Sequence, residues 1–468
     1  MTRGAAASPD LCAQRRSRLA EAIARLGGGV AVLPTAPERP RNADNDHPYR
    51  HCSHFHYLTG FDEPQAWLLL DAGGRSTLLC REKNTEREIW DGHRVGSEAA
   101  PALLGVHEAH PLEALDRLAV DKLADAGTVW FPFGSHDGLH ARIDGWLAEL
   151  RKRERQGVAT PQAQRDLAPL IAEMRLVKDE AELATMRHAA RISAGAHARA
   201  MRFSAGHFRA NAGAGLPEYR IEAELLHEFR RHGAQSPAYG SIVAAGANAC
   251  VLHYAAGDAE LKPGELCLID AGCELDGYAS DVTRTFPADG RFTSAQRELY
   301  DIVLAAQEAA IAVTRPGARK QDAHWAAVRV LAQGMLDTGL LSRDKVGDVD
   351  AVIESAAYRA FYMHGTGHWL GRDVHDVGEY LSLDEEPVEQ LDGLGARVVK
   401  KPSRRLQPGM VLTIEPGLYV RPAEGVPERF WHIGIRIEDD AVVTADGCEL
   451  ISRDVPVDAR EIEALMRG

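Results

Sequence analysis

One hairpin in the middle of the chain constrains the fold more tightly than any other stretch. Residues 269–286 read IDAGCELDGYASDVTRTF, and the Asp-Gly dipeptide inside them is a strong two-residue turn signal. Counting outward from that turn pairs Gly272 with Asp281 and Asp270 with Thr283. Asp270 and Asp281 then lie on one face as diagonal neighbours, about 7–8 Å apart.

Two carboxylates on one face of a hairpin need an explanation. A single aspartate in a strand is usually an exposed edge residue. Here Ile269 and Val282 flank the two acids, which favours a buried face. Buried carboxylates are costly unless cations compensate them, so we expect either a metal ion or a pair of arginines beside them.

The length of the chain, 468 residues, predicts two domains. The first third has the pattern of a small α/β domain, and a long helix rich in Ala, Arg and Glu begins near Met174. We therefore expect domains at 1–174 and 175–468. The elements predicted in the first domain are helices at 15–26 and 112–123 and strands at 30–33, 67–70, 76–80 and 128–131.

The second domain contains a short internal sequence repeat. Residues 261–270 read LKPGELCLID and residues 406–415 read LQPGMVLTIE, so the same Pro-Gly turn precedes two strands that each end in an acid. This predicts a duplicated unit whose acids, Asp270 and Glu415, converge near a pseudo-twofold axis. Helices are expected nearby, at 217–232 and 294–313.

A C-terminal strand adds a further acid and a base. Its sequence, HIGIRIED, alternates isoleucines with polar residues, so Arg436 and Glu438 share the face opposite the apolar one.

Three histidines, His364, His368 and His375, lie in the glycine-rich stretch MHGTGHWLGRDVHDVG. The glycines argue against a helix of the HExxH type, so we expect loop and strand. A lone histidine is more often a core or surface residue than a ligand, but three beside four acids favour a metal site.

The charge of this set predicts how many ions it holds. Four carboxylates and one neutral imidazole carry about −4, which two divalent cations would balance. Mostly oxygen ligands suit Mn²⁺, with Co²⁺, Fe²⁺ or Zn²⁺ as alternatives. Two such ions can share a hydroxide and polarise a carbonyl, as in aminopeptidases and phosphatases.

The overall charge disfavours nucleic acid and anionic membranes as partners, because 54 Lys and Arg stand against 68 Asp and Glu, a formal charge of −14. No signal peptide or membrane span is expected. The seven cysteines are scattered, without a CxxC pair, and predict a reducing, cytoplasmic location: Cys12, Cys52, Cys80, Cys250, Cys267, Cys273 and Cys448.

Several motifs together resemble one family. IDAGCELDGYASDVTRTFP, HGTGHWLGRDVHD, TIEPGLY and GIRIEDD look like aminopeptidase P, the Xaa-Pro aminopeptidase, and NADNDHPYRHCSHFHYLTGFDEP, residues 42–64, is similar to that family's N-terminal domain. The resemblance implies an α/β N-terminal domain followed by an α+β pita-bread catalytic domain, the creatinase/aminopeptidase fold. It covers nearly the whole chain.

The resemblance also implies a dinuclear manganese site. In the family pattern Asp281 and Glu438 bridge the ions, Asp270 holds one of them, and His368 and Glu415 hold the other.

Four more residues match the family's substrate site: His253, His364, His375 and Arg436. Our hypothesis is that a metal-activated hydroxide attacks the scissile carbonyl while His375 and His253 stabilise the intermediate. Glu415 helps to move the proton to the leaving nitrogen, and His364 and Arg436 shape the proline side.

The expected activity is release of the N-terminal residue from peptides with proline second, because a tertiary amide without an N–H requires a dedicated pocket. A prolidase specific for Xaa-Pro dipeptides is the nearest alternative. A non-catalytic pita-bread binding protein and metal-free, creatinase-like hydrolysis are less favoured, since all five ligand types are present.

Two features bear on how peptides reach the site. A homo-oligomer, dimer or tetramer, is expected, in which Trp90 either narrows the site of a neighbour or packs in a core. The segment 381–405 is an insert, predicted to be a solvated excursion or a lid that alters length preference.

Overall fold

The computed structural model describes residues 7–211, 213–392 and 396–468. The chain folds into two compact units, Met1–Met174 and Arg175–Gly468, called below the N-terminal and the C-terminal unit. Among the described residues, no helix is both long and apolar enough to cross a membrane.

The N-terminal unit is built on a mixed six-stranded sheet of order β6-β5-β4-β1-β7-β8. Alternate residues of β1 enter different apolar clusters, so both faces of the sheet are buried. The strands are β1 (Val30–Pro34), β4 (Trp67–Asp71), β5 (Ser76–Cys80), β6 (Glu108–Pro111), β7 (Thr128–Phe131) and β8 (Ala163–Asp166). The helices are α1 (Pro9–Arg25), α2 (Ser53–Thr59), α3 (Thr85–Asp91), α4 (Gly96–Leu104), α5 (Leu115–Leu123) and α6 (Leu139–Arg151).

The four strands predicted in this unit are confirmed. The helix predicted at 112–123 begins later, because its first residues form a short 3₁₀ turn, Leu112–Ala114, directly after β6. A small hairpin, β2 (Pro40–Asn42) and β3 (Asn45–Asp46), completes the unit's strands among the described residues.

The long helix expected from Met174 is two helices, α7 (Ala168–Leu176) and α8 (Glu180–Ala210). The break has a local cause. The Asp179 side chain accepts a hydrogen bond from the Glu182 N–H, and the Glu182 side chain accepts one from the Asp179 N–H, both at 2.9 Å. This capping box satisfies free N–H groups and starts α8 at Glu180.

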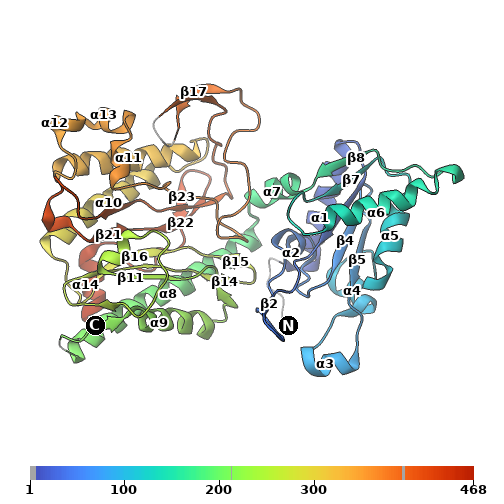
Figure 1. Ribbon diagram of the computed structural model, residues 1–468, viewed down its shortest axis with the longest axis horizontal. Coiled ribbons are helices and arrows are strands. Elements are labelled where there is room, and N and C mark those ends of the chain that lie inside the picture. The colour runs from blue at the N-terminus through green and yellow to red at the C-terminus, as the bar shows by residue number, and fades with distance from the viewer. Residues whose placement is uncertain (1–6, 212, 393–395) are drawn as a thin grey trace. The chain divides into compact units, whose positions relative to one another are not determined.

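In the C-terminal unit the strands lie between two pairs of helices, α8 with α9 (Glu218–Arg231) and α10 (Ser294–Val313) with α11 (Lys320–Asp337) (Figure 1). The helix predicted at 294–313 is confirmed, and the one predicted at 217–232 is shorter by one residue at each end. Three shorter helices are α12 (Arg343–Val346), α13 (Val349–Glu354) and α14 (Ala459–Arg467).

Two three-stranded sheets carry most of the site. One has the order β11-β13-β16 and the other β19-β22-β23. Their strands are β11 (Ile242–Ala245), β13 (Leu266–Asp270), β16 (Thr283–Pro287), β19 (Val411–Ile414), β22 (Asp439–Val443) and β23 (Cys448–Leu450). Smaller pairings involve β9 (Leu216–Pro217), β10 (Ser236–Pro237), β12 (Glu260–Leu261), β14 (Cys273–Leu275), β15 (Tyr278–Ala279), β20 (Gly417–Val420) and β21 (Ile433–Arg436).

The hairpin register predicted from the Asp-Gly turn is confirmed. Asp270 pairs with Thr283, and the same register continues through Leu275 and Tyr278 at the turn. The two strands pass from one sheet to another at Gly272. A Cβ there would lie 1.7 Å from the Ser280 carbonyl oxygen, so only glycine allows this close approach of the strands.

The insert forms a hairpin of β17 (Val388–Leu391) and β18 (Arg397–Lys400). Its ends are tied to the body of the unit. Leu381 forms a bridge with Ser403, and the Arg319 guanidinium donates to the Ser403 carbonyl at 2.8 Å and to Glu385 at 2.6 Å. The insert is therefore anchored at its base rather than fully solvated.

Candidate metal centre

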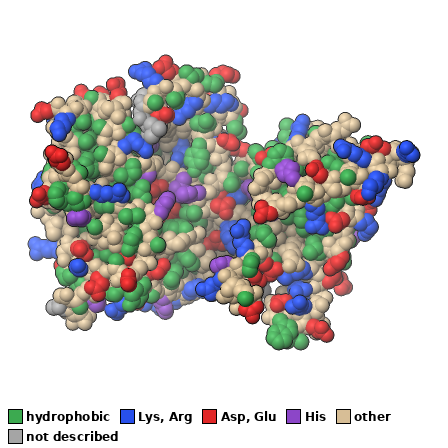
Figure 2. Space-filling model, viewed as in Figure 1, with side chains coloured by type: hydrophobic (Ala, Val, Ile, Leu, Met, Phe, Trp, Pro, Cys, Tyr) green, Lys and Arg blue, Asp and Glu red, His purple; other side chains and the backbone are tan. Residues whose placement is uncertain are grey.

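One cavity of about 670 Å³ in the C-terminal unit collects all nine residues proposed for the site. Histidine side chains gather near the middle of the face of this unit in Figure 2. The nine lining residues are Asp270, Asp281, His368, Glu415 and Glu438, with His253, His364, His375 and Arg436.

The carboxylates come from strand ends of both sheets. Asp270 ends β13 and Glu415 follows β19. The two repeated segments, 261–270 and 406–415, therefore both place their terminal acid in one cavity. Glu438 lies between β21 and β22. Its N–H donates to the Thr283 carbonyl at 3.1 Å, which joins it to the hairpin strand β16.

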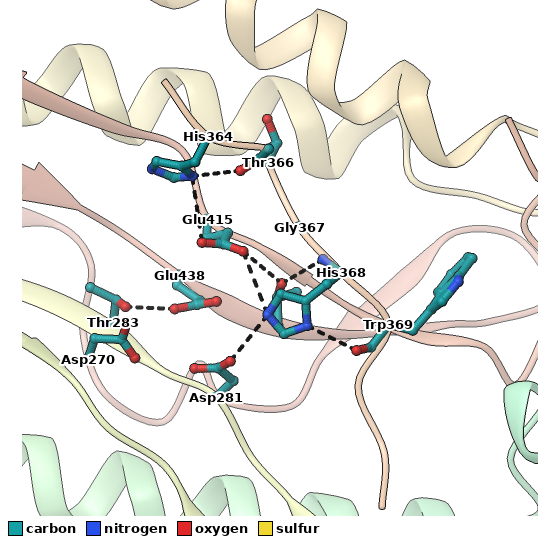
Figure 3. Close-up of polar contacts among 12 residues, drawn as sticks. Asp270, Asp281, Thr283, His364, Thr366, Gly367, His368, Trp369, Glu415 and Glu438 are labelled. Atoms are coloured by element: carbon teal, nitrogen blue, oxygen red, sulfur yellow. Dashed lines mark hydrogen bonds and ion pairs between the residues drawn. The ribbon is translucent and has the colours of Figure 1, made fainter. Parts of the chain in front are cut away.

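Asp281, His368 and Glu438 form the tightest group. Each offers one ligand atom, and these three atoms all lie within 4.8 Å of one another. His368 Nε2 is 3.3 Å from Asp281 Oδ2 and 3.7 Å from Glu415 Oε1 (Figure 3). Its other nitrogen, Nδ1, bonds the Trp369 carbonyl at 2.9 Å, so the ring turns Nε2 toward the acids.

Asp270 completes the ring of acids in Figure 3 and is held by two partners. The Arg436 guanidinium donates to its Oδ2 at 2.6 Å, and the Tyr239 hydroxyl lies 2.6 Å from its Oδ1. The same hydroxyl is 2.5 Å from Asp281 Oδ1. Tyr239 therefore stands between the two aspartates with one proton to share.

Sequence reasoning missed three residues of this first layer. Tyr239 has no motif around it, so nothing in the sequence indicated its role. Thr283 donates to Glu438 Oε2 at 2.6 Å, and its place opposite Asp270 followed from the register. The Tyr419 hydroxyl accepts from Arg436 at 3.0 Å and contacts His364 Nε2 at 2.8 Å.

Three acids of the site, Asp281, Glu415 and Glu438, resist ionisation. Burial raises the pKa of Glu415 to about 7, with the charges of Asp281 and Asp270 adding to it. Burial and neighbouring acids also raise the pKa of Asp281 and of Glu438. For His368 burial opposes the charge, but Asp281 and Glu415 outweigh it and raise its pKa to about 9.

These shifts describe a buried excess of negative charge that the protein's own cations do not balance. Carboxylate oxygens and one oriented imidazole nitrogen are donors suited to hard or borderline divalent cations. The residues present therefore fit a divalent metal, and Asp281, His368 and Glu438 are close enough to share one. Asp270 and Glu415 line the same cavity and extend the donor set.

The remaining histidines surround the acids. The rings of His368 and His375 lie 4.2 Å apart, and burial lowers the pKa of His375. Burial also lowers the pKa of His364 to about 3, so this ring is neutral at pH 7. His253 lies on the cavity wall, beyond a 3₁₀ turn that ends at Cys250. The structure thus brings all four predicted histidines to one cavity.

The His368 loop is held like an extra strand against β19. The Thr413 N–H donates to the His368 carbonyl at 3.0 Å and the Glu415 N–H to the Thr366 carbonyl at 2.9 Å. A Cβ at Gly367 would lie 1.9 Å from the Thr413 carbonyl oxygen. This glycine therefore permits the close pairing that sets His368 beside Glu415.

A buried arginine, Arg284, holds the part of the site that β16 and β22 form. The Arg284 guanidinium donates to the Glu438 carbonyl at 2.6 Å, the Thr283 carbonyl at 2.9 Å and Asp439 Oδ1 at 2.7 Å. Both charged groups of the Arg284–Asp439 pair are fully buried. The pair links β16 to β22 directly behind Glu438.

A buried ion cluster holds the far end of the histidine loop, next to His375. Asp376 accepts from Arg175 at 2.5 Å and from Lys178 at 2.9 Å, and all three side chains are about 1% exposed. Arg175 also pairs with Asp373 at 2.7 Å, which is 38% exposed. Two cations from the start of the unit thus converge on one loop carboxylate.

Comparison with known proteins gives full-length matches. A family model described as metallopeptidase family M24 matches residues 184–445, and one described as aminopeptidase P, N-terminal domain, matches residues 12–130. The chain is 42% identical over 457 residues to the Xaa-Pro aminopeptidase of Escherichia coli K12, covering 97% of this chain and 96% of that protein. It is 40% identical to the Xaa-Pro aminopeptidase of Haemophilus influenzae, with the same coverage.

Solved structures agree over the same length. The aminopeptidase PepP of Pseudomonas aeruginosa superposes with a TM-score of 0.88 at 44% identity, covering 98% of each chain. A zinc-substituted E. coli aminopeptidase P in complex with product has a TM-score of 0.88 at 42% identity, again covering 98% of each chain.

We predict that Asp376→Asn destabilises the C-terminal unit by roughly 3–5 kcal/mol, because it removes the buried carboxylate that balances Lys178 and one of the carboxylates that pair with Arg175. The matched change Asp373→Asn removes a half-exposed partner and should cost under about 1 kcal/mol. Thermal unfolding followed by circular dichroism measures both. Equal losses in the two variants would contradict the assignment of Asp376 as the central carboxylate.

The difference in stability between wild type and Asp376→Asn should depend on pH. Burial opposes ionisation of Asp376, but Lys178 and Arg175 outweigh it and lower its pKa. A lowered folded-state pKa contributes stability above the unfolded value, about 4, and loses it as the pH falls below that value. The gap between wild type and Asp376→Asn should therefore narrow in acid.

Proposed function

Because the chain belongs to metallopeptidase family M24 and matches aminopeptidase P over its whole length, we propose that it removes the N-terminal residue from peptides whose second residue is proline. The family and the two-part fold class expected from the sequence are confirmed. One observation supports the proposal most directly: four carboxylates and an oriented histidine line one cavity.

We assign residues 1–174 as the α/β aminopeptidase P domain and 175–468 as the pita-bread catalytic domain. The first range includes the match of the N-terminal domain model, and the second includes the match to family M24. A prolidase remains the second candidate activity, but the curated relatives are Xaa-Pro aminopeptidases.

Two divalent cations, with manganese as the native metal, are proposed for the site. The residues that would hold them are Asp270, Asp281, His368, Glu415 and Glu438, with Asp281 and Glu438 shared between the ions. When bound, such a pair lowers the pKa of water and polarises a peptide carbonyl.

The protein's own groups then have separate tasks. His375 and His253 are proposed to donate hydrogen bonds to the carbonyl oxygen of the scissile bond as it gains charge. Glu415 is proposed to carry the proton to the proline nitrogen, which must be protonated to leave.

His364 and Arg436 are proposed to form the proline side of the cavity. Tyr419 supports both, because its hydroxyl contacts His364 and accepts from Arg436. Arg436 is buried and also bonds Asp270, so it is rigidly placed. A rigid wall at this point suits the proline ring, whose nitrogen has no N–H for the protein to bind.

A homo-oligomer is proposed from the surface of the N-terminal unit. Trp90 is 83% exposed and Ile89 is 77% exposed, both on α3, and Figure 2 shows an apolar patch at this tip. The alternative that Trp90 packs in a core is therefore wrong. An exposed Trp-Ile pair is typical of an interaction surface, so a second copy is the proposed occupant.

A cytoplasmic location is proposed from the cysteines. None of the seven forms a disulfide, and five of them are buried. Seven cysteines outside disulfides suit a reducing compartment.

Cleavage of Ala-Pro-Ala to alanine and Pro-Ala is the expected activity, with Ala-Ala-Ala resistant. EDTA should abolish turnover and Mn²⁺ should restore it, as measured by chromatography of the products. Cleavage of Ala-Pro without Ala-Pro-Ala would establish the prolidase instead, and activity indifferent to EDTA would exclude the metal mechanism.

Asp281→Asn should lower kcat by at least about 10²-fold and reduce the manganese bound per chain, because it removes a shared charged ligand. Asp276→Asn, in the exposed turn of the same hairpin, is the matched control and should change neither value. Metal content is measured by mass spectrometry after gel filtration. Full metal content with unchanged kcat in Asp281→Asn would overturn the ligand assignment.

Trp90→Ala combined with Ile89→Ser should weaken self-association, because it removes the exposed apolar pair on α3. Sedimentation velocity measures the shift toward monomer, and the near-isosteric change Glu86→Gln on the same helix, which removes no apolar surface, serves as control. An unchanged distribution of species in the double variant would exclude α3 from the interface.

A further inference from the structure

A second cavity, of about 320 Å³, adjoins the metal-site cavity in the C-terminal unit. The two cavities share His364, Gly365 and Gly367 as walls. A Cβ added at Gly365 would meet no heavy atom within 4 Å. The shared loop therefore carries no side chain at this point, and the space beside Gly365 is open.

The walls of the second cavity are basic. Lys320, Arg359 and Lys400 line it together with His324, and none of its lining residues in the described part of the chain is an aspartate or glutamate. A hollow lined by one sign of charge concentrates ions of the opposite sign. This contrasts with the acidic cavity next to it.

The ammonium group of Lys320 contacts mainly uncharged groups. Its ammonium donates to the Gly367 carbonyl at 2.6 Å and lies 4.7 Å from the centre of the Tyr380 ring. Burial lowers its pKa to about 8, while the charge of Glu415 opposes that shift. The ammonium therefore bonds a neutral carbonyl rather than a carboxylate.

His324 reports the same positive field. Its Nδ1 contacts the Thr366 hydroxyl at 2.9 Å, which holds the ring beside the cavity. Burial lowers its pKa to about 4, and the charges of Lys320 and Arg359 act in the same direction. Three basic groups thus face one small volume.

The insert supplies one more basic residue, Lys400. Lys400 ends β18, and Leu381 and Ser403 from the anchored base of the insert also line the cavity. The insert thus closes one side of this hollow.

We propose that the second cavity is a carboxylate-binding subsite for the part of the peptide that follows proline. The inference rests on the proposed function, in which His364 marks the proline side. A chain leaving that wall advances about 3.3–3.6 Å per residue, so the residue after proline reaches the shared loop. The carboxylate is either the C-terminal carboxylate of a tripeptide or the acidic side chain of a longer one.

Two pairs of peptides test this and separate the two sources. Ala-Pro-Ala is compared with its C-terminal amide, and Ala-Pro-Glu-amide with Ala-Pro-Gln-amide. A charge-assisted hydrogen bond predicts that kcat/KM for the acid exceeds that for its neutral partner by at least about fivefold in one pair. Preference in the first pair identifies the terminal carboxylate, and preference in the second identifies the side chain.

Lys400→Met and Arg359→Gln should each reduce the acid-to-neutral ratio toward one. Lys400 lies on a surface hairpin, so its variant keeps the test valid even if Arg359→Gln folds poorly. Lys401→Met is the matched control, because Lys401 bonds the Leu383 carbonyl at 2.7 Å and does not line the cavity. It should keep the wild-type ratio.

Equal kcat/KM for acid and neutral peptides in both pairs would overturn the subsite. A wild-type preference that Lys400→Met leaves unchanged, or an equal loss on acid and neutral peptides, would overturn it as well. Failure to cleave any of the four peptides would instead refute the proposed function, so the two failures are distinguishable.

Discussion

The mutual repulsion of four carboxylates in one cavity, two of them buried, is the constraint on which the rest of the catalytic unit depends. Bringing Asp270, Asp281, Glu415 and Glu438 into one cavity is unfavourable unless positive charge and hydrogen-bond donors compensate it. The fold supplies part of that compensation from Arg436, and the hydroxyls of Tyr239 and Thr283 supply donors. The remaining negative charge is what makes the cavity a site for divalent cations.

Holding the acids against this repulsion requires a rigid frame, and the frame consists of buried ionic and backbone contacts. Arg284 donates to the Glu438 carbonyl and so links Glu438 to the hairpin strand β16. The Asp376 ion cluster holds the loop that carries the histidines. The pairing of Thr366 and His368 with β19 sets the distance between His368 and Glu415. These groups do not face substrate, yet each fixes a residue that does.

The charge pattern also extends beyond the metal site. A negative cavity and a positive one lie on opposite sides of the glycine-rich loop. One sign attracts metal ions and the other suits a carboxylate, so a peptide is oriented by charge as well as by shape. The anchored insert contributes to the positive side and so joins the substrate-binding region of the unit.

Much of the catalytic geometry could be predicted from local sequence, because a two-residue turn sets the register of a hairpin and alternation sets the face of each residue. That reasoning placed Asp270 opposite Thr283 and put Arg436 and Glu438 on one face of their strand. It failed where a boundary depended on a capping box, as at Asp179, and where a short turn replaced the first helical turn at Leu112. Such ends are decided by a few side-chain hydrogen bonds.

The sequence by itself determined the residue types of the site, the strand ends that carry them and the two-part organisation of the chain. Only the tertiary structure decided that Tyr239 stands between two aspartates, that Asp376 receives two buried cations and that Lys320 and Lys400 face one cavity. The physical reason is range. Register and periodicity act between neighbours along the chain, whereas these contacts join segments whose approach depends on how whole sheets and helices pack.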